Sequence, residues 1–194
     1  HYAQSTGFTC GPAALMMAAA ALRPGFALDL ATELQLWREA TTVFMTSGHG
    51  GCSPRGLALA AARRGFLVDL YLNQGGALFV DGVRDPVKKK VIEAVHEAFE
   101  AQVANERRIL RHERAPGIEG LRAHLDAGGL PLVLISHFLL SRTKTPHWVL
   151  VVAVDEHFVY LHDPEIDVEQ HKSVTDSMYV PVRHASFLKM SRYG

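Results

Sequence analysis

The most informative part of the sequence is Gln4-Ser5-Thr6-Gly7-Phe8-Thr9-Cys10-Gly11-Pro12-Ala13-Ala14-Leu15, in which a polar loop is predicted to run directly into a helix at Cys10. The following residues are strong helix formers, and Pro12 suits a first helical turn. A thiol attacks only as the thiolate, which a helix N-terminus stabilises through its dipole and free N–H groups. Cys10 is therefore a candidate nucleophile, and Gly11 would let a substrate carbonyl approach the backbone. The alternative is that Cys10 is simply a small buried residue.

A base and an orienting acid for such a thiol lie far along the chain. His147 stands at the start of an apolar stretch, residues 148–154, with the β-branched and aromatic residues of a strand. A second such stretch, residues 157–161, follows a short polar turn and precedes Asp163, which is the layout of a β-hairpin. The hairpin should bring Asp163 beside His147, where it could accept a hydrogen bond and fix the tautomer of the imidazole. Cys10 and His147 are 137 positions apart, within the ~130–150 positions of papain-type enzymes.

These motifs resemble those of the peptidase C39-like family of papain-like cysteine peptidases. The matching segments follow the order of the family: residues 4–15, 52–57, 61–66, 129–133, 146–149 and 162–164. The resemblance implies that Cys10 is the nucleophile, His147 the base and Asp163 the orienting acid. It also implies that the amide of Gln4 helps to form an oxyanion hole, where one donor is worth ~3 kcal/mol. We expect Gly11 and Trp148, the neighbours of the nucleophile and the base, to contact substrate.

The sequence predicts an α+β protein with a papain-like fold, in which an N-terminal helical half carrying the nucleophile helix packs on a C-terminal antiparallel sheet. Helices are expected over residues 10–22, 30–40, 53–64, 85–112 and 117–125, and strands over residues 66–72, 130–135, 148–154 and 157–161. The chain of 194 residues fits a single papain-like domain, residues 1–194. The segment 85–115 is expected to be a helical insertion. Its apolar stripe should pack on the core and consists of Val87, Val91, Val95, Phe99 and Val103.

Composition and charge exclude several classes of protein. Apolar residues make up 48% of the chain and charged residues 21%, the balance of a globular protein. Twenty basic residues offset twenty acidic ones, so no net field attracts nucleic acid or a membrane surface. No apolar run reaches the ~18 residues that span a bilayer. Two cysteines are too few for a disulfide scaffold, which predicts a reducing compartment and a cytoplasmic location. The chain does not begin with methionine, so we expect a trimmed chain, a processing product or a fragment.

A glycine-rich segment, His49-Gly50-Gly51-Cys52, contains two competent zinc ligands. A structural zinc site needs four ligands, and no CxxC or HxxxH pair supplies the others, so we predict no metal. We expect His49, Gly50, Gly51 and Cys52 to belong to a loop that lines the substrate cleft. A disulfide between Cys10 and Cys52 is a further alternative.

Four acidic residues, Asp163, Glu165, Asp167 and Glu169, alternate near the end of the predicted hairpin. Calcium binding is conceivable, but the EF-hand spacing and its glycine are absent. A solvated edge or a site for a cationic peptide is the preferred interpretation. No Walker or dinucleotide-binding motif is present, and we predict no cofactor.

These residues predict a cysteine peptidase or amidase that acts on a peptide or amide substrate through an acyl-enzyme at Cys10. Two alternatives remain open. An acyltransferase or transpeptidase would pass the acyl group to an amine instead of water, and a non-catalytic module would bind a leader peptide without turnover. The presence of all four catalytic residue types favours an enzyme. The sequence leaves the oligomeric state open.

Overall fold

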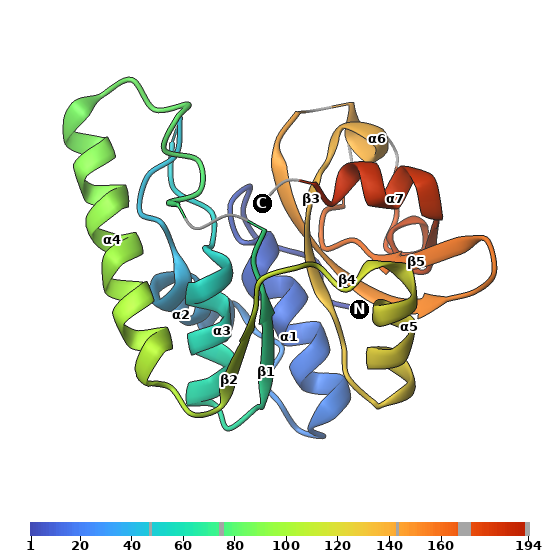
Figure 1. Cartoon of the computed structure of the whole chain (residues 1–194). Coiled ribbons are helices and arrows are strands. Elements are labelled where there is room, and N and C mark those ends of the chain that lie inside the picture. Colours follow the sequence, from blue (N-terminus) through green and yellow to red (C-terminus); the bar gives the residue numbers. More distant parts are fainter. Residues whose placement is uncertain (47, 74–75, 143, 167–171, 193–194) are drawn as a thin grey trace. The chain divides into compact units, whose positions relative to one another are not determined.

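A computed structural model describes residues 1–46, 48–73, 76–142, 144–166 and 172–192. The chain divides into two compact units, one formed by His1–Leu28 with Pro116–Gly194 and the other by Asp29–Ala115. Figure 1 shows helices in both units and the larger sheet in the first. This mixture, with helices early in the chain and an antiparallel sheet late in it, confirms the predicted α+β class.

The first unit is built on a four-stranded antiparallel sheet in the order β3-β4-β5-β6. Its strands are β3 (Leu132–Ser136), β4 (Pro146–Val154), β5 (Phe158–His162) and β6 (Val180–Arg183). The predicted hairpin is confirmed as β4 and β5. Its turn is held by Asp155, whose carboxylate accepts hydrogen bonds of 2.7 Å from the backbone N–H groups of His157 and Phe158. The pattern of the sequence did not reveal β6.

Helices pack on both faces of this sheet. Successive residues of a strand face opposite sides, and Leu150 of β4 packs with Met17 of α1 (Cys10–Leu22). Val149 instead joins a cluster with Leu121 of α5 (Gly117–Asp126) and Phe187 of α7 (His184–Met190). Burial on both faces explains why the sequence of β4 is a continuous apolar run. The nucleophile helix therefore packs on the sheet, as predicted. Two short elements complete the unit, α6 (Phe138–Ser141) and the 3₁₀-helix η1 (Thr175–Ser177).

The second unit has three helices and a two-stranded parallel sheet. Its elements are α2 (Leu30–Ala40), α3 (Pro54–Arg63), β1 (Val68–Tyr71), α4 (Pro86–Asn105) and β2 (Ile109–His112). Each helix begins at a side-chain cap, since Asp29, Ser53 and Asp85 accept hydrogen bonds from first-turn backbone N–H groups. The core of the unit includes Leu59 of α3 and Leu70 of β1.

The long helix differs from its prediction in its end and in its buried face. It ends at Asn105, and residues 109–112, predicted as helix, form β2 in parallel register with β1. The buried residues of α4 are Ile92, Phe99 and Val103, whereas Val87 is 67% exposed. Four residues advance an α-helix about 40° beyond one turn. A strict four-residue repeat therefore winds away from the core.

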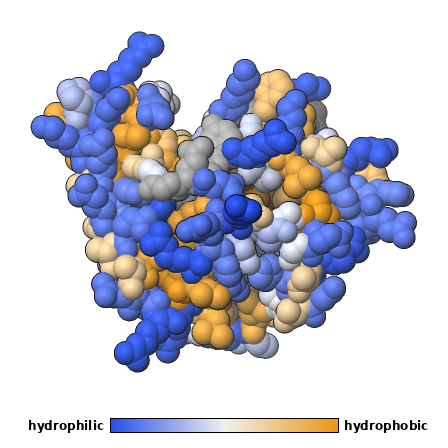
Figure 2. All heavy atoms as spheres, viewed as in Figure 1, coloured by the Kyte–Doolittle hydropathy of each residue, from blue (hydrophilic) through white to orange (hydrophobic). Residues whose placement is uncertain are grey.

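None of the helices that the structure describes has both the length and the hydrophobicity to cross a lipid bilayer. On the face drawn in Figure 2, hydrophilic residues predominate and apolar residues occupy smaller areas between them. Exposed apolar side chains such as Leu67 and Leu110 are normal for a protein surface when they are scattered.

Gly56 allows α3 to lie close to α2, and we predict that Gly56→Ala destabilises the protein. A Cβ atom at this position would lie 2.6 Å from both the Cα atom and the carbonyl oxygen of Ala40. Backbone atoms cannot move aside easily, so the free energy of unfolding should fall by roughly 1–3 kcal/mol, although alanine favours helix. Denaturant unfolding followed by circular dichroism measures the change. Gly76→Ala is the control, because a Cβ there meets no atom within 4 Å. Equal effects of the two substitutions would contradict the prediction.

Candidate active site

Cys10 is the first residue of α1, and the helix end in front of it is not capped by a side chain. The preceding residue, Thr9, makes no capping hydrogen bond. Its hydroxyl is engaged by Thr6 instead, through an Oγ1–Oγ1 distance of 2.9 Å and a bond from the Thr6 N–H of 3.2 Å. The first N–H groups of a helix have no partner within it. This helix start therefore favours an anion beside Cys10.

His147 and Asp163 come together as the hairpin predicted. The register pairs Leu150 of β4 with His162 of β5, so the end of β5 lies near the start of β4. The Nε2 atom of His147 is 2.7 Å from Oδ1 of Asp163, and both side chains are buried. The buried thiol of Cys10 is close enough to the His147 ring to raise its pKa through a hydrogen bond and through charge. Since Asp163 engages Nε2, Nδ1 is the ring nitrogen left for the thiol.

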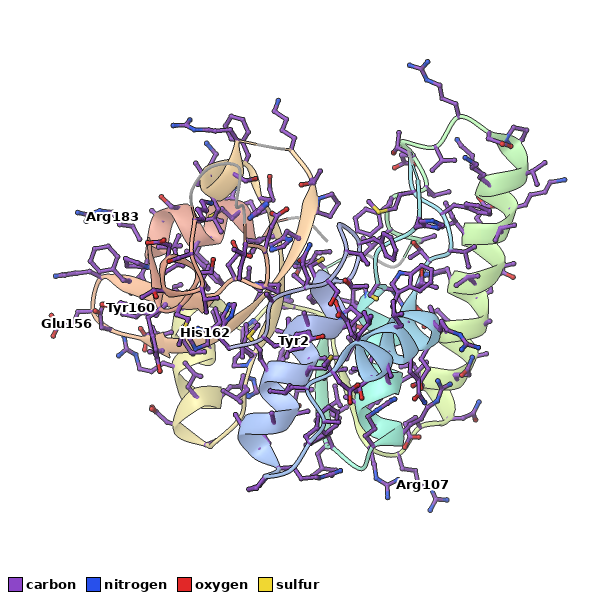
Figure 3. The ribbon with its side chains drawn as sticks, turned by 180° about the vertical axis from the view of Figure 1, so that it is seen from behind. Tyr2, Arg107, Glu156, Tyr160, His162 and Arg183 are labelled. Atoms are coloured by element: carbon purple, nitrogen blue, oxygen red, sulfur yellow. The ribbon has the colours of Figure 1, made fainter. Side chains whose placement is uncertain are left out.

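The N-terminal segment passes beside the end of β5. Figure 3 shows this strand running from Tyr160, in the outer part of the hairpin, to His162 near Tyr2. His1 Nε2 lies 2.7 Å from the carbonyl oxygen of Asp163. This contact brings the start of the chain to the backbone of Asp163, the residue whose carboxylate binds His147.

Gln4 lies in the loop before Cys10. Its backbone N–H donates to the carbonyl of Pro164 at 2.8 Å, and Pro164 directly follows Asp163 in the chain. Its side-chain Nε2 donates to the carbonyl of Thr6 at 3.0 Å. Its Oε1 atom is buried and accepts no hydrogen bond from the described part of the chain. Its place in the oxyanion hole stays a prediction.

The charges of His147 and Asp163 are set by burial and hydrogen bonding. Burial lowers the pKa of His147, but its hydrogen bonds to Asp163 and Cys10 outweigh this effect and raise the pKa to about 10. Burial raises the pKa of the Asp163 carboxyl, but hydrogen bonds from His137 and His147 hold it well below its usual range. At neutral pH the pair is therefore an imidazolium beside a carboxylate.

His137 is a buried residue of this site that the sequence analysis did not identify. Its Nε2 atom lies 3.2 Å from Oδ2 of Asp163, and its ring stacks on that of His147 with centroids 4.0 Å apart and planes 20° from parallel. The register pairs Ser136 of β3 with Pro146 of β4, so His137 and His147 lie near the same end of neighbouring strands. Antiparallel pairing of the two predicted strands was the signal that could have revealed it.

Glu165 was expected on a solvated edge or at a cationic-peptide site. Its side chain is half-buried, with Oε2 3.0 Å from Nδ1 of His137. The hydrogen bond from His137 lowers the pKa of Glu165. Asp163 is buried, so a solvated edge is wrong for that residue. The side chain of Glu165 is 39% exposed, and its place on a solvated edge or at a cationic-peptide site stays a prediction. Asp167 and Glu169 lie outside the described residues.

Comparison with known proteins adds one match. A family model described as Peptidase_C39 like family matches residues 1–194. The chain belongs to the Peptidase_C39 like family. The resemblance carried by the sequence motifs is thereby confirmed, and it indicates a peptidase-type hydrolase. No curated protein and no solved structure matches the chain.

In this Peptidase_C39-like chain, the expected substrate loop lies in the second compact unit. Isolated bridges pair Thr41 with Cys52 and Phe44 with His49. The carbonyl of Gly50 accepts hydrogen bonds from the Trp37 indole at 2.9 Å and the Thr41 hydroxyl at 3.0 Å. The segment from His49 to Cys52 thus has an ordered local structure, and its contact with substrate stays a prediction.

The two other expected substrate residues lie in the first unit. Gly11 is buried in the first turn of α1. Trp148 is buried in β4, where it pairs with Leu134 of β3. Their contact with substrate also stays a prediction. Neither Cys10 nor Cys52 forms a disulfide, so that alternative is not realised.

Among the described residues, His137, His147 and Asp163 form the group whose ligand atoms, all within 4.8 Å of one another, could hold a metal ion. Two ligands on a tetrahedral zinc lie about 3.4 Å apart, given metal–ligand bonds near 2.1 Å. The 2.7 Å between His147 Nε2 and Asp163 Oδ1 is shorter than this separation. The distance between these two atoms is that of a hydrogen bond.

We predict that His147 in this Peptidase_C39-like protein titrates near pH 10 instead of near its ordinary value. Folding raises the pKa of His147 to about 10. The protonated ring therefore stabilises the folded state fully below the unfolded pKa of ~6.5, and this stabilisation is lost as the pH rises through the folded pKa. In Asp163→Asn the ring should titrate at lower pH, because the neutral amide has no negative charge to stabilise the imidazolium against burial. Histidine side-chain NMR measures the pKa of this ring in the parent and in Asp163→Asn, and the signal lost in His147→Gln assigns the ring. A parent ring that titrates near 6.5 would contradict the prediction.

Proposed function

We propose that the protein is a papain-like cysteine hydrolase that cleaves peptide or amide bonds through an acyl-enzyme at Cys10. The observation that supports this most directly is the hydrogen-bonded series from Cys10 to His147 to Asp163 at the start of α1. A nucleophile, a base and a group that orients the base are the parts that covalent acyl transfer requires. Membership of the Peptidase_C39 like family supports the same kind of chemistry.

Acylation begins with the thiolate of Cys10 paired with the imidazolium of His147. The sulfur attacks the substrate carbonyl carbon, a C–S bond forms, and the carbonyl π electrons move to its oxygen. When the tetrahedral intermediate collapses, the C–N bond breaks and His147 donates its proton to the leaving amine. Asp163 keeps the ring oriented in both protonation states.

Deacylation returns the enzyme to its first state. His147 accepts a proton from water, the hydroxide attacks the thioester carbon, and the C–S bond breaks to give a carboxylic acid and the thiolate. An amine that replaces this water would give acyl transfer, so the second reactant decides between hydrolase and transferase. We place this chemistry in the cytoplasm, since neither cysteine is in a disulfide.

The oxyanion needs donors at the start of α1. We assign this role to Gln4 together with backbone N–H groups of the first helical turn. The amide of Gln4 uses one N–H on the Thr6 carbonyl. Its NH₂ group has a second N–H, and that one is available to a substrate.

The cysteines should react unequally with a thiol reagent. Iodoacetamide at neutral pH should label Cys10 much faster than an ordinary cysteine, since its thiolate is paired with His147. Cys10→Ala should lose both labelling and turnover of peptide amides, whereas Cys52→Ala should keep most of both. Peptide mass spectrometry locates the label, and release of an amine from a library of fluorogenic peptide amides measures turnover. Thermal unfolding of each variant controls for loss of fold.

Two results would count against the proposal. Equal loss of activity in Cys10→Ala and Cys52→Ala would remove the special role of Cys10. A parent that labels rapidly but cleaves no amide and transfers no acyl group to added amines would point to a binding module instead.

Gln4→Ala should separate oxyanion stabilisation from thiol reactivity. Amide hydrolysis should slow by ~10²-fold or more, because one oxyanion donor is lost. Alkylation by iodoacetamide should remain near the parent rate, because that displacement develops no oxyanion. The two rates are compared in the same preparations. Unchanged amide hydrolysis in Gln4→Ala would show that Gln4 has no such role.

A further inference from the structure

His137 is the buried titratable group of the first unit that the proposed chemistry leaves without a role. It is 2% exposed and lies between two acidic side chains. Its Nε2 atom faces Asp163 Oδ2 at 3.2 Å, and its Nδ1 atom faces Glu165 Oε2 at 3.0 Å. The hydroxyl of Ser141 lies 2.9 Å from the same Nδ1.

Each ring nitrogen of His137 faces a carboxylate oxygen, an arrangement that is fully satisfied when both nitrogens carry a proton. An ionised carboxylate only accepts hydrogen bonds, and a neutral imidazole has one donor and one acceptor nitrogen. Hydrogen bonds from His137 lower the pKa of both Asp163 and Glu165, so both face the ring as carboxylates. A neutral His137 would point a lone pair at one of them. Ser141 fits the same assignment, because its hydroxyl can accept from Nδ1 and donate to the His137 carbonyl, 3.3 Å away.

The contacts of His137 also limit the movement of the other two groups. His147 and His137 bind different oxygens of the Asp163 carboxylate, and their rings stack. The carboxylate therefore cannot rotate about its C–C bond without losing both hydrogen bonds. The stacked ring restricts the tilt of His147 in the same way.

We propose that His137, as an imidazolium clamped between Asp163 and Glu165, is a positioning residue that keeps the Asp163 carboxylate ionised and oriented toward His147. The series of contacts then runs from Glu165 through His137, Asp163 and His147 to Cys10. The role in catalysis rests on the proposed function, whereas the charge and the clamp do not. Partners of this kind, one step from the reacting groups, typically change activity by ~10–100-fold when they are removed.

The groups facing Asp163 determine the expected pH dependence. Its side chain faces His147 of β4 and His137 at the end of β3, and Glu165 follows in the same segment. His1 contacts its carbonyl oxygen from the N-terminal segment. Loss of the His137 hydrogen bond removes one of the two contacts that oppose burial, so the pKa of Asp163 should rise although His147 still lowers it. The site needs this carboxylate ionised. In a variant that lacks the His137 hydrogen bond, activity should therefore be lost on acidification at a higher pH than in the parent.

The first test does not depend on catalysis. Nitrogen-15 NMR of histidine-labelled protein at pH 7 should show protons on both ring nitrogens of His137, identified by the signal lost in His137→Gln. Glu165→Gln, which removes the charge but keeps the shape, should reduce this double protonation. A His137 ring with one protonated nitrogen would overturn the proposal. So would about one zinc ion per purified chain that is absent from His137→Gln, because the histidines would then be metal ligands.

The second test measures iodoacetamide labelling of Cys10 against pH in a Cys52→Ala background. His137→Phe keeps a ring but supplies no donor to Asp163. The pH at which labelling declines on acidification (the acid limb) should therefore rise. At a pH below this acid limb, the labelling rate constant should be ~10-fold or more lower than in the parent. His137→Gln can still donate to Asp163 and should restore much of the rate. His157→Gln, at an exposed histidine of the β4–β5 turn, is the matched control.

The outcomes of the second test are distinct. An unchanged acid limb in both His137→Phe and Glu165→Gln would overturn the positioning role, and thermal unfolding identifies a variant that has lost its fold. Slow labelling of the parent, unaffected by His147→Ala, would instead contradict the proposed function. The NMR result would still decide the state of His137.

Discussion

The Asp163 carboxylate is the group on which the rest of the site depends. A carboxylate removed from water is destabilised unless charged or polar donors surround it. Here Oδ1 accepts from His147 at 2.7 Å and from the backbone N–H of Glu165 at 2.9 Å, and Oδ2 accepts from His137. These donors hold its pKa down in spite of burial. The same bonds that keep Asp163 ionised fix the two imidazole rings.

Main-chain hydrogen bonds hold Asp163 in place from several directions. Its N–H donates to the carbonyl of Ser177 at 2.9 Å, which ties the end of β5 to η1. The next carbonyl, that of Pro164, accepts from Gln4 in the loop before α1. Gln4 precedes Cys10 by only six positions. The segment that carries Asp163 and the segment that carries Cys10 are therefore linked directly by a backbone hydrogen bond.

Local signals in the sequence predicted those parts of the site that have a local cause. Helix formers after Cys10 and the apolar run from Trp148 to Val154 are patterns of neighbouring residues, and both gave the observed elements. The place of Asp163 followed because a hairpin turn is also local. His137 was not predicted, because its position depends on pairing of β3 with β4 across a longer connection.

The difference between local and long-range causes also explains the wrong predictions in the second unit. Residues 109–112 have no strong strand pattern of their own, and they become a strand because β1 offers a parallel partner. The buried face of α4 depends on which of its residues contact α3 and β1. The apolar four-residue repeat alone therefore gave a wrong prediction for Val87, which is exposed. Contacts that are distant in sequence decided both cases.

The orientation of the Gln4 side-chain amide bears on its proposed role in the reaction. A buried carbonyl oxygen without a hydrogen bond costs about 1–3 kcal/mol, and Oε1 of Gln4 is in that position within the described chain. Turning the amide over would place Oε1 against the carbonyl of Thr6, so that two acceptors would face each other. The observed orientation is therefore the better of the two, and it directs the NH₂ group toward the loop before Cys10. Local rules of polar satisfaction are most often broken at functional sites. Under the proposed function, the orientation that leaves Oε1 unsatisfied is also the one in which the second N–H of the Gln4 amide would donate to the oxyanion.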